Sequence, residues 1–504
     1  MRPDPDRLPV VLATGQALDR SGELGPLDLA ERAARVVLDG PGDLARRIER
    51  VSVVNVLSHR AGPAPASELA ARLGLAPARA ETTAIGGNSP QLLVNRAAAE
   101  VASGRLGAAL VAGAEAIRAT RLAPQADPSP PAAGSDEVVG AERQDLSEGE
   151  RAAGLLVPVF VYPLFESVLA ARAGRTNAEQ RSEIGRLLEG FSAVAAGHPY
   201  AWFRQPLTAG EIATPSPANR LVAEPYTKRM IAFLGSSQGS ALVVTSLGAA
   251  RALGREDEAV FVWAGADAEE VWYPIARPDL AAAPALGSAF EAVFSAAGVG
   301  PDDLNRLDLY SCFPSAVAIA AGELGVALDD RRGLTVTGGL AYFGGPGSNY
   351  VGHSIATMCE LLRRDGEGIG LVTGVGWYLT KHSVGLYGAT PPPLGFSAAE
   401  APPPGPQVPV ASGLSEPAHG RVEAATVLYD RGAVPLAAPA LVRLPDGSRL
   451  AAAVGPEALA EVAEAGALRP LVGLEVEVVP GRPPTYRLGA GVARPILSTA
   501  KEGP

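Results

Sequence analysis

The most restrictive feature of the sequence is an alternation of short apolar runs with helical patterns, which occurs twice along the chain. The first pass contains "PVVLATGQ", "ASELAARLGL" and "AALVAGAEA", and the second contains "SALVVTS", "GSAFEAVFSAAGV" and "GIGLVTGVGWYL". Apolar runs that alternate with helices predict a mostly parallel sheet with helices on both faces. Because the two passes are similar in order and length, we expect a duplicated α/β half.

Composition divides the chain into five segments. Residues 1–120 and 231–392 hold the two α/β passes. Residues 121–230 begin with a proline-rich loop and continue as a long helical pattern, which predicts an insertion over the sheet. Residues 393–410 form a proline-rich linker, and residues 411–504 contain short alternating apolar runs with a "PDGS" turn, which favours a small all-β barrel or sandwich.

Charge and cysteine content limit the cellular setting and the partners. The formal net charge of −11 disfavours nucleic acid and anionic membranes as partners. No apolar run is long enough to span a bilayer, and the N-terminus lacks the pattern of a signal peptide. Two cysteines make no disulfide framework, and the His, Asp and Glu residues show no metal-ligand spacing. We therefore expect a cytoplasmic protein that requires no metal or other cofactor and binds small molecules or proteins.

The stretch "TTAIGGNSPQLLVN" carries a strong signal for the start of a helix. Ser89 and Pro90 fit an N-cap and a first helical residue, and Gly104 fits the stop. The helix between them is almost uniformly small or apolar, which predicts burial in the centre of the fold. A thiol at a buried helix N-terminus would have a lowered pKa and act as a nucleophile, yet no cysteine stands there.

The order of these elements and several motifs resemble the thiolase superfamily, in particular the sterol-carrier-protein-type thiolase-like proteins that are often labelled acetyl-CoA acetyltransferases. The motifs are "GGNSPQLLVNRAAAEVASGRLGAALVAGAEA", "SSQGSALVVTS", "DLYSCFPSAV", "TVTGGLAYFGGPGSN" and "GLVTGVGWYLTKHS", and the resemblance spans roughly residues 8 to 390. It implies a thiolase fold of two βαβαβ-type halves in αβαβα layers, a CoA or acyl-CoA ligand and a role in lipid metabolism. Thiolases commonly dimerise through their sheets, but the additional C-terminal domain leaves the homodimer an open question.

The same resemblance implies that the thiolase chemistry is missing. An alignment on "SGRLGAALVAGAE" without gaps puts the acyl-accepting cysteine of active thiolases at Gly87, and the oxyanion-hole histidine falls at Gly345. The second catalytic cysteine falls near Val375, and Tyr310 stands where thiolases carry an asparagine or histidine that orients a water. Thiolysis and Claisen condensation need a covalent acyl-enzyme and oxyanion stabilisation, so we do not expect either activity.

Two further motifs supply candidate site residues. Tyr310 and Cys312 end the apolar run "RLDLYSCF" and are expected at the carboxyl edge of the sheet, where α/β folds bind ligands. "WYLTKHS" places Lys381 beside His382, a candidate general base. Cys312 has an alternative role as a small buried hydrophobe, and the Lys381–His382 pair an alternative role as a polar strand end. The other ligand-binding candidates are Asn88 and Ser89 at the helix start, Gly344, Gly345 and Asn349 in the glycine-rich loop, and Lys228.

The scarcity of lysine in the sequence supports Lys228 and Lys381 as site residues. Lysine and arginine together number 43, but lysine occurs only at Lys228, Lys381 and Lys501. Since arginine serves as the general surface cation of this chain, Lys228 and Lys381 mark positions where a compact ammonium differs in function from a planar guanidinium.

Three functions fit these observations. The preferred one is a thiolase-like protein that binds a CoA thioester or related acyl ligand without the thiolase cysteines. The first alternative is a carbon–carbon lyase of the retro-aldol type, or an acyl-CoA hydrolase, that uses Tyr310 and His382; related thiolase-like proteins with retro-aldol activity use tyrosines in such a site. The second alternative is a non-catalytic interaction protein whose C-terminal β domain docks a protein partner.

Overall fold

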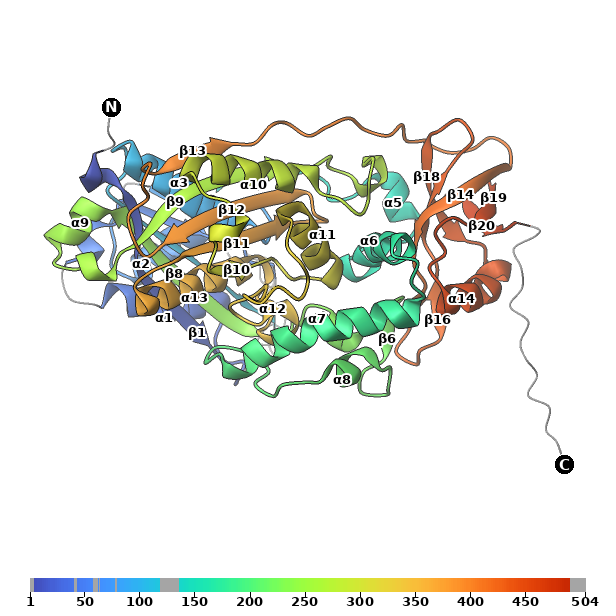
Figure 1. Ribbon diagram of the computed structural model, residues 1–504, viewed down its shortest axis with the longest axis horizontal. Helices are drawn as coiled ribbons and strands as arrows, with labels where there is room; N and C mark the ends of the chain where they lie inside the picture. Colours follow the sequence, from blue (N-terminus) through green and yellow to red (C-terminus); the bar gives the residue numbers. More distant parts are fainter. Residues whose placement is uncertain are drawn as a thin grey trace.

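The computed structural model describes residues 4–39, 43–57, 62, 64–77, 79–117 and 136–489. Two halves of a large β-sheet enclose central helices and carry further helices on their outer faces, and a small barrel lies at one end of the molecule (Figure 1). This architecture confirms the α/β fold class and the β-rich C-terminal domain expected from the sequence. Within the described residues, no helix combines the length and apolarity needed to cross a membrane.

The first half contributes strands in the order β3-β2-β4-β8-β1. β2 runs parallel to β3 and β4, whereas β8 is antiparallel to β4 and to β1. β4 is buried along its whole length, which explains its continuous run of small and apolar residues. The strands are β1 (Pro9–Leu18), β2 (Arg50–Val53), β3 (Arg79–Thr83), β4 (Ala108–Ala116) and β8 (Ser237–Ser246).

The second half repeats this arrangement. Its strands lie in the order β10-β11-β12-β9, with β10 parallel to β11, and β12 antiparallel to β11 and to β9. The halves meet where β1 pairs with β9 in antiparallel register at Val10 and Phe261. The duplication predicted from the sequence is therefore confirmed. The strands are β9 (Val260–Glu269), β10 (Arg306–Asp308), β11 (Ile369–Gly376) and β12 (Lys381–Gly388).

Two helices form the middle layer. α3 (Ser89–Ala102) and α13 (Tyr350–Asp365) pack on each other and on strands of both halves. Because α3 is covered from several sides, its sequence shows no single apolar stripe. α3 packs closely on β12 at Gly385. A Cβ built on this glycine would lie 2.2 Å from Nε2 of Gln91 in α3, so only glycine fits there. The outer helices include α1 (Pro26–Leu38), α2 (Pro65–Arg72), α10 (Pro284–Ala297) and α11 (Pro314–Leu324).

Local details differ from the sequence-based expectations. The N-cap of α3 is Asn88 rather than Ser89, whose hydroxyl instead donates to the carbonyl of Ala84 at 3.2 Å. β10 ends at Asp308, so Tyr310 and Cys312 follow the strand in a loop. Ser89 is held by this local bond, whereas the backbone of Tyr310 is held by a tertiary contact, its N–H donating to Oγ1 of Thr373.

The segment between the halves contributes to the main sheet as well as covering it. β5 (Glu137–Val139) pairs in parallel with β3 at the edge of the sheet. The rest of the insertion forms α5 (Glu148–Ala152), α6 (Pro158–Arg172), α7 (Asn177–Gly197), α8 (Ala209–Ala213), β6 (Leu221–Ala223) and β7 (Tyr226–Thr227). In the segment expected to be a linker, β13 (Ser397–Glu400) pairs with the distal part of β9.

The C-terminal domain is a closed barrel with the strand order β14-β17-β18-β20-β19. β18 and β20 are parallel, and β19 closes the barrel on β14. In chain order this is 1-2-3-5-4, with a helix between the third and fourth strands, which is the topology of an OB-fold. The helix was not expected from the sequence. The elements are β14 (Ala418–Ala425), β17 (Ala440–Arg443), β18 (Arg449–Val454), α14 (Leu459–Leu468), β19 (Glu475–Val479) and β20 (Thr485–Leu488).

The barrel packs against the α/β core through its first three strands, with Ala424 of β14 and the N–H of Ala425 meeting α6. Leu441 of β17 and Ala451 of β18 belong to the main hydrophobic core rather than to the core of the barrel. Arg449 of β18 donates from Nη1 to the carbonyls of Ile275 and Arg277, at 2.9 and 2.6 Å. OB-folds commonly bind their ligands on this face of the second and third strands, so here that face is used for contact within the chain.

Candidate functional site

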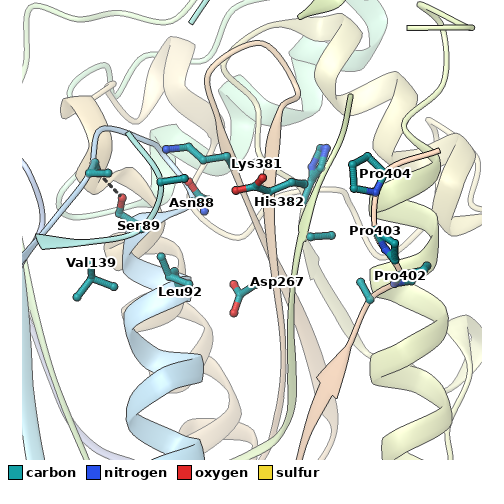
Figure 2. A pocket seen from close by; sticks show the side chains of 16 residues that line it. Asn88, Ser89, Leu92, Val139, Asp267, Lys381, His382, Pro402, Pro403 and Pro404 are labelled. Atoms are coloured by element: carbon teal, nitrogen blue, oxygen red, sulfur yellow. Dashed lines mark hydrogen bonds between the residues drawn. The ribbon is translucent and has the colours of Figure 1, made fainter. Parts of the chain in front are cut away.

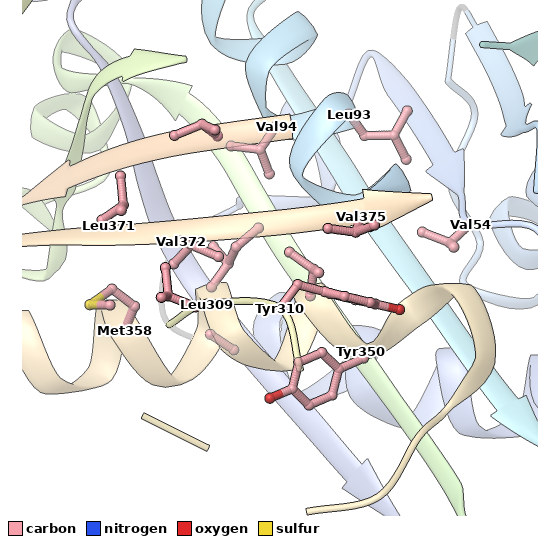
Figure 3. Packing of buried hydrophobic residues seen from close by; sticks show 14 of the residues in the cluster. Val54, Leu93, Val94, Leu309, Tyr310, Tyr350, Met358, Leu371, Val372 and Val375 are labelled. Atoms are coloured by element: carbon pink, nitrogen blue, oxygen red, sulfur yellow. The ribbon is translucent and has the colours of Figure 1, made fainter. Parts of the chain in front are cut away.

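The space beside Gly87, where the sequence alignment predicts a missing nucleophile, is filled by a tyrosine. A Cβ built on Gly87 would lie 2.1 Å from the hydroxyl oxygen of Tyr310 and 2.6 Å from the carbonyl oxygen of Val375. Tyr310 approaches from the loop after β10, where its backbone N–H donates to Oγ1 of Thr373 at 2.9 Å. Figure 3 shows the Tyr310 side chain beside Val375 and Tyr350 in the buried cluster. A side chain at position 87 and Tyr310 therefore cannot occupy this place together.

The surroundings keep Tyr310 in its protonated form. The residue is 6% exposed, and its ring makes an edge contact with Tyr350 at 5.8 Å between centroids. Burial raises the pKa of the phenol well above its usual value. No hydrogen bond from a described residue is found at its hydroxyl. Tyr310 therefore stays protonated near neutral pH, where its hydroxyl can donate a hydrogen bond but cannot act as a base.

In the glycine-rich loop before α13, backbone and side-chain N–H groups form hydrogen bonds within the protein. The N–H of Gly345 donates to the carbonyl of Phe233 at 2.9 Å, and that of Gly347 donates to the carbonyl of Gly345 at 2.8 Å. The side chain of Asn349 donates to the carbonyl of Gly113 at 2.8 Å. Gly344 has a φ of +119°, which requires glycine, and it lies against Gln238. These contacts leave no donor of Gly345, Gly347 or Asn349 aimed at a ligand, so the loop acts as a brace between the halves.

A cavity of about 270 Å³ lies at the first turn of α3 (Figure 2). It is bounded by the helix start, by the ends of β9 and β12, and by the chain that follows β5 and β13. The exposed prolines Pro402 to Pro404 form one rim, which places the opening at the surface. The lining residues are Ala84, Asn88, Ser89, Leu92, Val139, Gly140, Ala141, Asp267, Ala268, Glu269, Lys381, His382, Ala401, Pro402, Pro403 and Pro404.

Lys381 is the charged group closest to the helix start. It is 7% exposed, and its ammonium donates to the carbonyl of Ile85 and lies 5.9 Å from the ring centroid of Trp377. Loss of hydration lowers its pKa, against the opposing charges of Glu142 and Glu269. No carboxylate among the described residues forms an ion pair with it. The structure thus holds an ammonium in a recess without a direct counter-ion.

The neighbouring polar groups are acceptors. The buried Oδ1 of Asn88 has no hydrogen-bond partner, while its Nδ2 donates to Ser383 at 3.1 Å. Asp267 extends into the cavity in Figure 2 and accepts from Nδ2 of Asn95 at 3.2 Å. Loss of hydration in this recess raises the pKa of Asp267 to about 6. Asp267 therefore exchanges its proton near neutral pH.

The other candidate residues lie outside this cavity, apart from His382, which lines it but offers no available base. The imidazole of His382 is fully buried, with Nε2 3.1 Å from the carbonyl of Leu379, and desolvation lowers its pKa to about 3. Burial raises the pKa of Cys312 to about 12, so its thiol is unreactive. Lys228 is exposed in the short helical turn Lys228–Met230. Of the predicted site residues, the cavity therefore brings together Asn88, Ser89 and Lys381, with only the strand position of His382 beside them.

Asp267 and Glu269 were missed by the sequence analysis. They lie at the end of the run "AVFVWAGAD", which predicts only an apolar strand, and just after it. Alternate residues at the end of a strand share a face, so the spacing of Asp267 and Glu269 in "GADAEE" was the signal that could have identified them. Their position opposite Lys381 and Ser383 of β12 depends on the register of β9 with β12, which the sequence does not display.

The buried His382 predicts a pH dependence of stability. Its pKa is about 3 in the folded protein, against about 6.5 in an unfolded chain, so the unfolded state binds more protons between these values. The free energy of unfolding should fall as the pH drops from about 6.5 toward 3, with His382 contributing up to about 1.4 kcal/mol per pH unit.

Urea unfolding of His382→Gln across this pH range should show a shallower slope than the wild type. The matched control is His419→Gln, since His419 lies exposed on the barrel. Equal slopes for wild type and His382→Gln would contradict a neutral, buried imidazole.

Comparisons with known proteins were made at the level of sequence and of structure. No protein-family model matches the chain, and no curated protein matches its sequence. Among solved structures, the chain is similar to the Ltp2–ChsH2(DUF35) aldolase, with 18% identity over 76% of this chain and 98% of that chain, and a TM-score of 0.60. It is also similar to the dimeric peroxisomal thiolase of Saccharomyces cerevisiae, with 15% identity over 76% and 98%, and a TM-score of 0.57. At these identities the two structures establish the thiolase fold.

A third solved structure resembles the chain over nearly its whole length. It is a monomeric SCP2-thiolase-like protein of type 1 from Mycobacterium smegmatis, with a TM-score of 0.82. The two sequences are 30% identical, and the match covers 97% of this chain and 100% of that one, so it includes most of the barrel. On this identity and coverage, the chain belongs to the SCP2-thiolase-like proteins.

Proposed function

We propose that this protein binds a CoA thioester or a related acyl ligand at the N-terminal end of α3 and performs neither thiolysis nor Claisen condensation. One observation carries the negative part: the Tyr310 hydroxyl lies where the side chain of a nucleophile at position 87 would be. A second supports it, because the N–H of Gly345 is bonded to Phe233 and so does not serve an oxyanion. Without a nucleophile and an oxyanion site, no acyl-enzyme forms.

The cavity at α3 supports the positive part. It is of a size near the lower limit of small-molecule sites and has an apolar side, with Leu92 and Val139, and a polar side, with Asn88 and Lys381. An acyl chain fits the apolar side, and the thioester or phosphate groups would meet the Lys381 ammonium and the positive end of the α3 dipole. We further propose a cytoplasmic monomer, because β5 covers the edge strand β3 and the relative from Mycobacterium smegmatis is monomeric.

Isothermal titration of the purified protein with CoA, acetyl-CoA and a longer acyl-CoA tests this function. We expect saturable binding that strengthens with the length of the acyl chain, together with no thiolysis of acetoacetyl-CoA. Leu92→Trp should weaken binding by filling the cavity, while Phe203→Ala, an exposed residue outside the cavity, should leave it unchanged. Absence of binding by folded protein, or measurable thiolysis, would overturn the proposal.

A second candidate is carbon–carbon bond cleavage of the retro-aldol type. The observation in its favour is the protonated Tyr310 hydroxyl at the vacant nucleophile position, where it can donate a hydrogen bond to a developing enolate. One of the similar structures is described as an aldolase. The burial of His382 and its lowered pKa argue against this residue as the base. Cleavage of a 3-hydroxyacyl-CoA by the wild type, detected as released aldehyde or ketone, separates this function from binding alone.

A further inference from the structure

Lys381 has the surroundings of a lysine that reacts with carbonyl groups. Its side chain is 7% exposed, lines a cavity with an open rim, and has no ion-pair partner among the described residues. Ammonium groups that are desolvated and lack a counter-ion lose their proton more readily, and the neutral amine is the nucleophile. Loss of hydration lowers the pKa of Lys381 in line with this geometry.

The cavity also holds groups that can move the protons of such a reaction. In the register of β12 with β9, Lys381 lies opposite Glu269, and Ser383 lies opposite Asp267. Because residues two apart on a strand share a face, these four side chains lie on the face that meets α3. Asp267, whose pKa is raised to about 6, is the member best suited to exchange a proton near neutral pH.

The apolar side of the cavity indicates the kind of molecule that fits beside the amine. Leu92, Val139 and the rim Pro402 to Pro404 bound the space next to Lys381 (Figure 2). They offer contact for a short aliphatic chain but few hydrogen bonds, and the volume of about 270 Å³ restricts the ligand to a small molecule.

We infer that Lys381 forms a covalent imine with a small aliphatic aldehyde or ketone in this cavity. The neutral ε-amine adds to the carbonyl carbon, and the carbinolamine then loses one water as the C=N bond forms. Asp267 donates the proton that the departing hydroxyl takes up and recovers one from the nitrogen, so the step needs no oxidant or reductant. The inference uses the cavity of the proposed acyl site but does not depend on CoA.

The scarcity of lysine makes the test specific. Wild-type protein is incubated with pentanal and sodium cyanoborohydride, which reduces an imine to a stable secondary amine, and labelled peptides are mapped by mass spectrometry. The chain has three lysines, of which Lys228 is exposed and serves as the internal reference. Because the lowered pKa of Lys381 raises its fraction of neutral amine and the cavity holds the aldehyde beside it, its peptide should be labelled several-fold faster than that of Lys228.

Two variants distinguish an imine at Lys381 from nonspecific labelling of surface amines. Lys381→Arg keeps a cation but forms no imine and should abolish labelling of that peptide while Lys228 is labelled as before. Asp267→Asn keeps Lys381 but removes the proton donor and should slow its labelling. Equal labelling rates for Lys381 and Lys228, or labelling of Lys228 alone, would overturn the inference. Acyl-CoA titration of Lys381→Arg, with no carbonyl compound present, shows independently whether the proposed binding function survives.

Discussion

A side chain at position 87 is expected to destabilise the protein instead of preparing it for catalysis. In Gly87→Ala the new Cβ would lie 2.1 Å from the Tyr310 hydroxyl oxygen and 2.6 Å from the Val375 carbonyl oxygen, so both must shift. Overpacking of a buried site costs typically about 1–3 kcal/mol. Gly87→Cys should lose at least as much stability and gain no thiolysis, because the thiol has no room beside Tyr310.

A double-mutant cycle with Tyr310→Ala isolates the contact. Removing the ring also removes the closest clash. The loss of unfolding free energy caused by Gly87→Ala should therefore be smaller by about 1 kcal/mol or more in the Tyr310→Ala background than in the wild type. The Val375 carbonyl remains in the way, so the cost should not vanish. The matched control is Gly190→Ala in α7, where no atom lies within 4 Å of the new Cβ and a small gain of helix stability is expected. Additive effects of the two substitutions in urea unfolding would show that Tyr310 does not fill the position.

Arg449→Ala is expected to have the largest effect on stability, because Arg449 joins the barrel to the α/β core. The residue is 2% exposed, and besides its bonds to the carbonyls of Ile275 and Arg277 it donates from Nε to Glu423 at 2.6 Å. Its removal leaves two buried carbonyls without their donor, and among the described residues Glu423 keeps only its contact with Arg443. A buried acceptor that loses its donor typically costs about 1–3 kcal/mol, so we expect a loss of several kcal/mol for the two carbonyls together.

Urea unfolding and limited proteolysis measure this effect together. Cleavage in the segment 401–417 should become faster in Arg449→Ala because the barrel is held less tightly. Arg487→Ala is the control: Arg487 also pairs with a glutamate of the barrel, Glu477, but is exposed, and such surface pairs contribute about 0–1 kcal/mol. Similar losses for the two variants would mean that Arg449 does not dock the barrel.

Local patterns predicted the fold because the halves are built from strongly periodic elements. β4, β8, β9 and β11 each contain an apolar run and are buried along most of their length, as strands covered on both faces require. Short elements were harder to predict. The run that ends in Tyr310 continues beyond β10 as a loop, and α14 was not assigned because its alanine-rich sequence stands among strand-like segments.

The candidate site was predicted only in part for a related reason. The absence of a cysteine at Gly87 follows from a motif alignment within a single segment. The cavity, in contrast, is assembled from five distant parts of the chain: the start of α3, the segment after β5, the end of β9, the start of β12 and the rim at Pro402 to Pro404. Asp267 and Glu269 became visible as site residues only when strand register placed them opposite Ser383 and Lys381.

The sequence by itself determined the duplicated α/β halves and the β-rich C-terminal domain. These follow from residue type and periodicity, which are local properties of the chain. Only the tertiary structure decided that Tyr310 occupies the space beside Gly87, that Lys381 is buried without a counter-ion, and that Arg449 docks the barrel. Each of these depends on contacts between residues far apart in sequence, which fill space and exclude water. Such contacts exist only when the whole chain has folded.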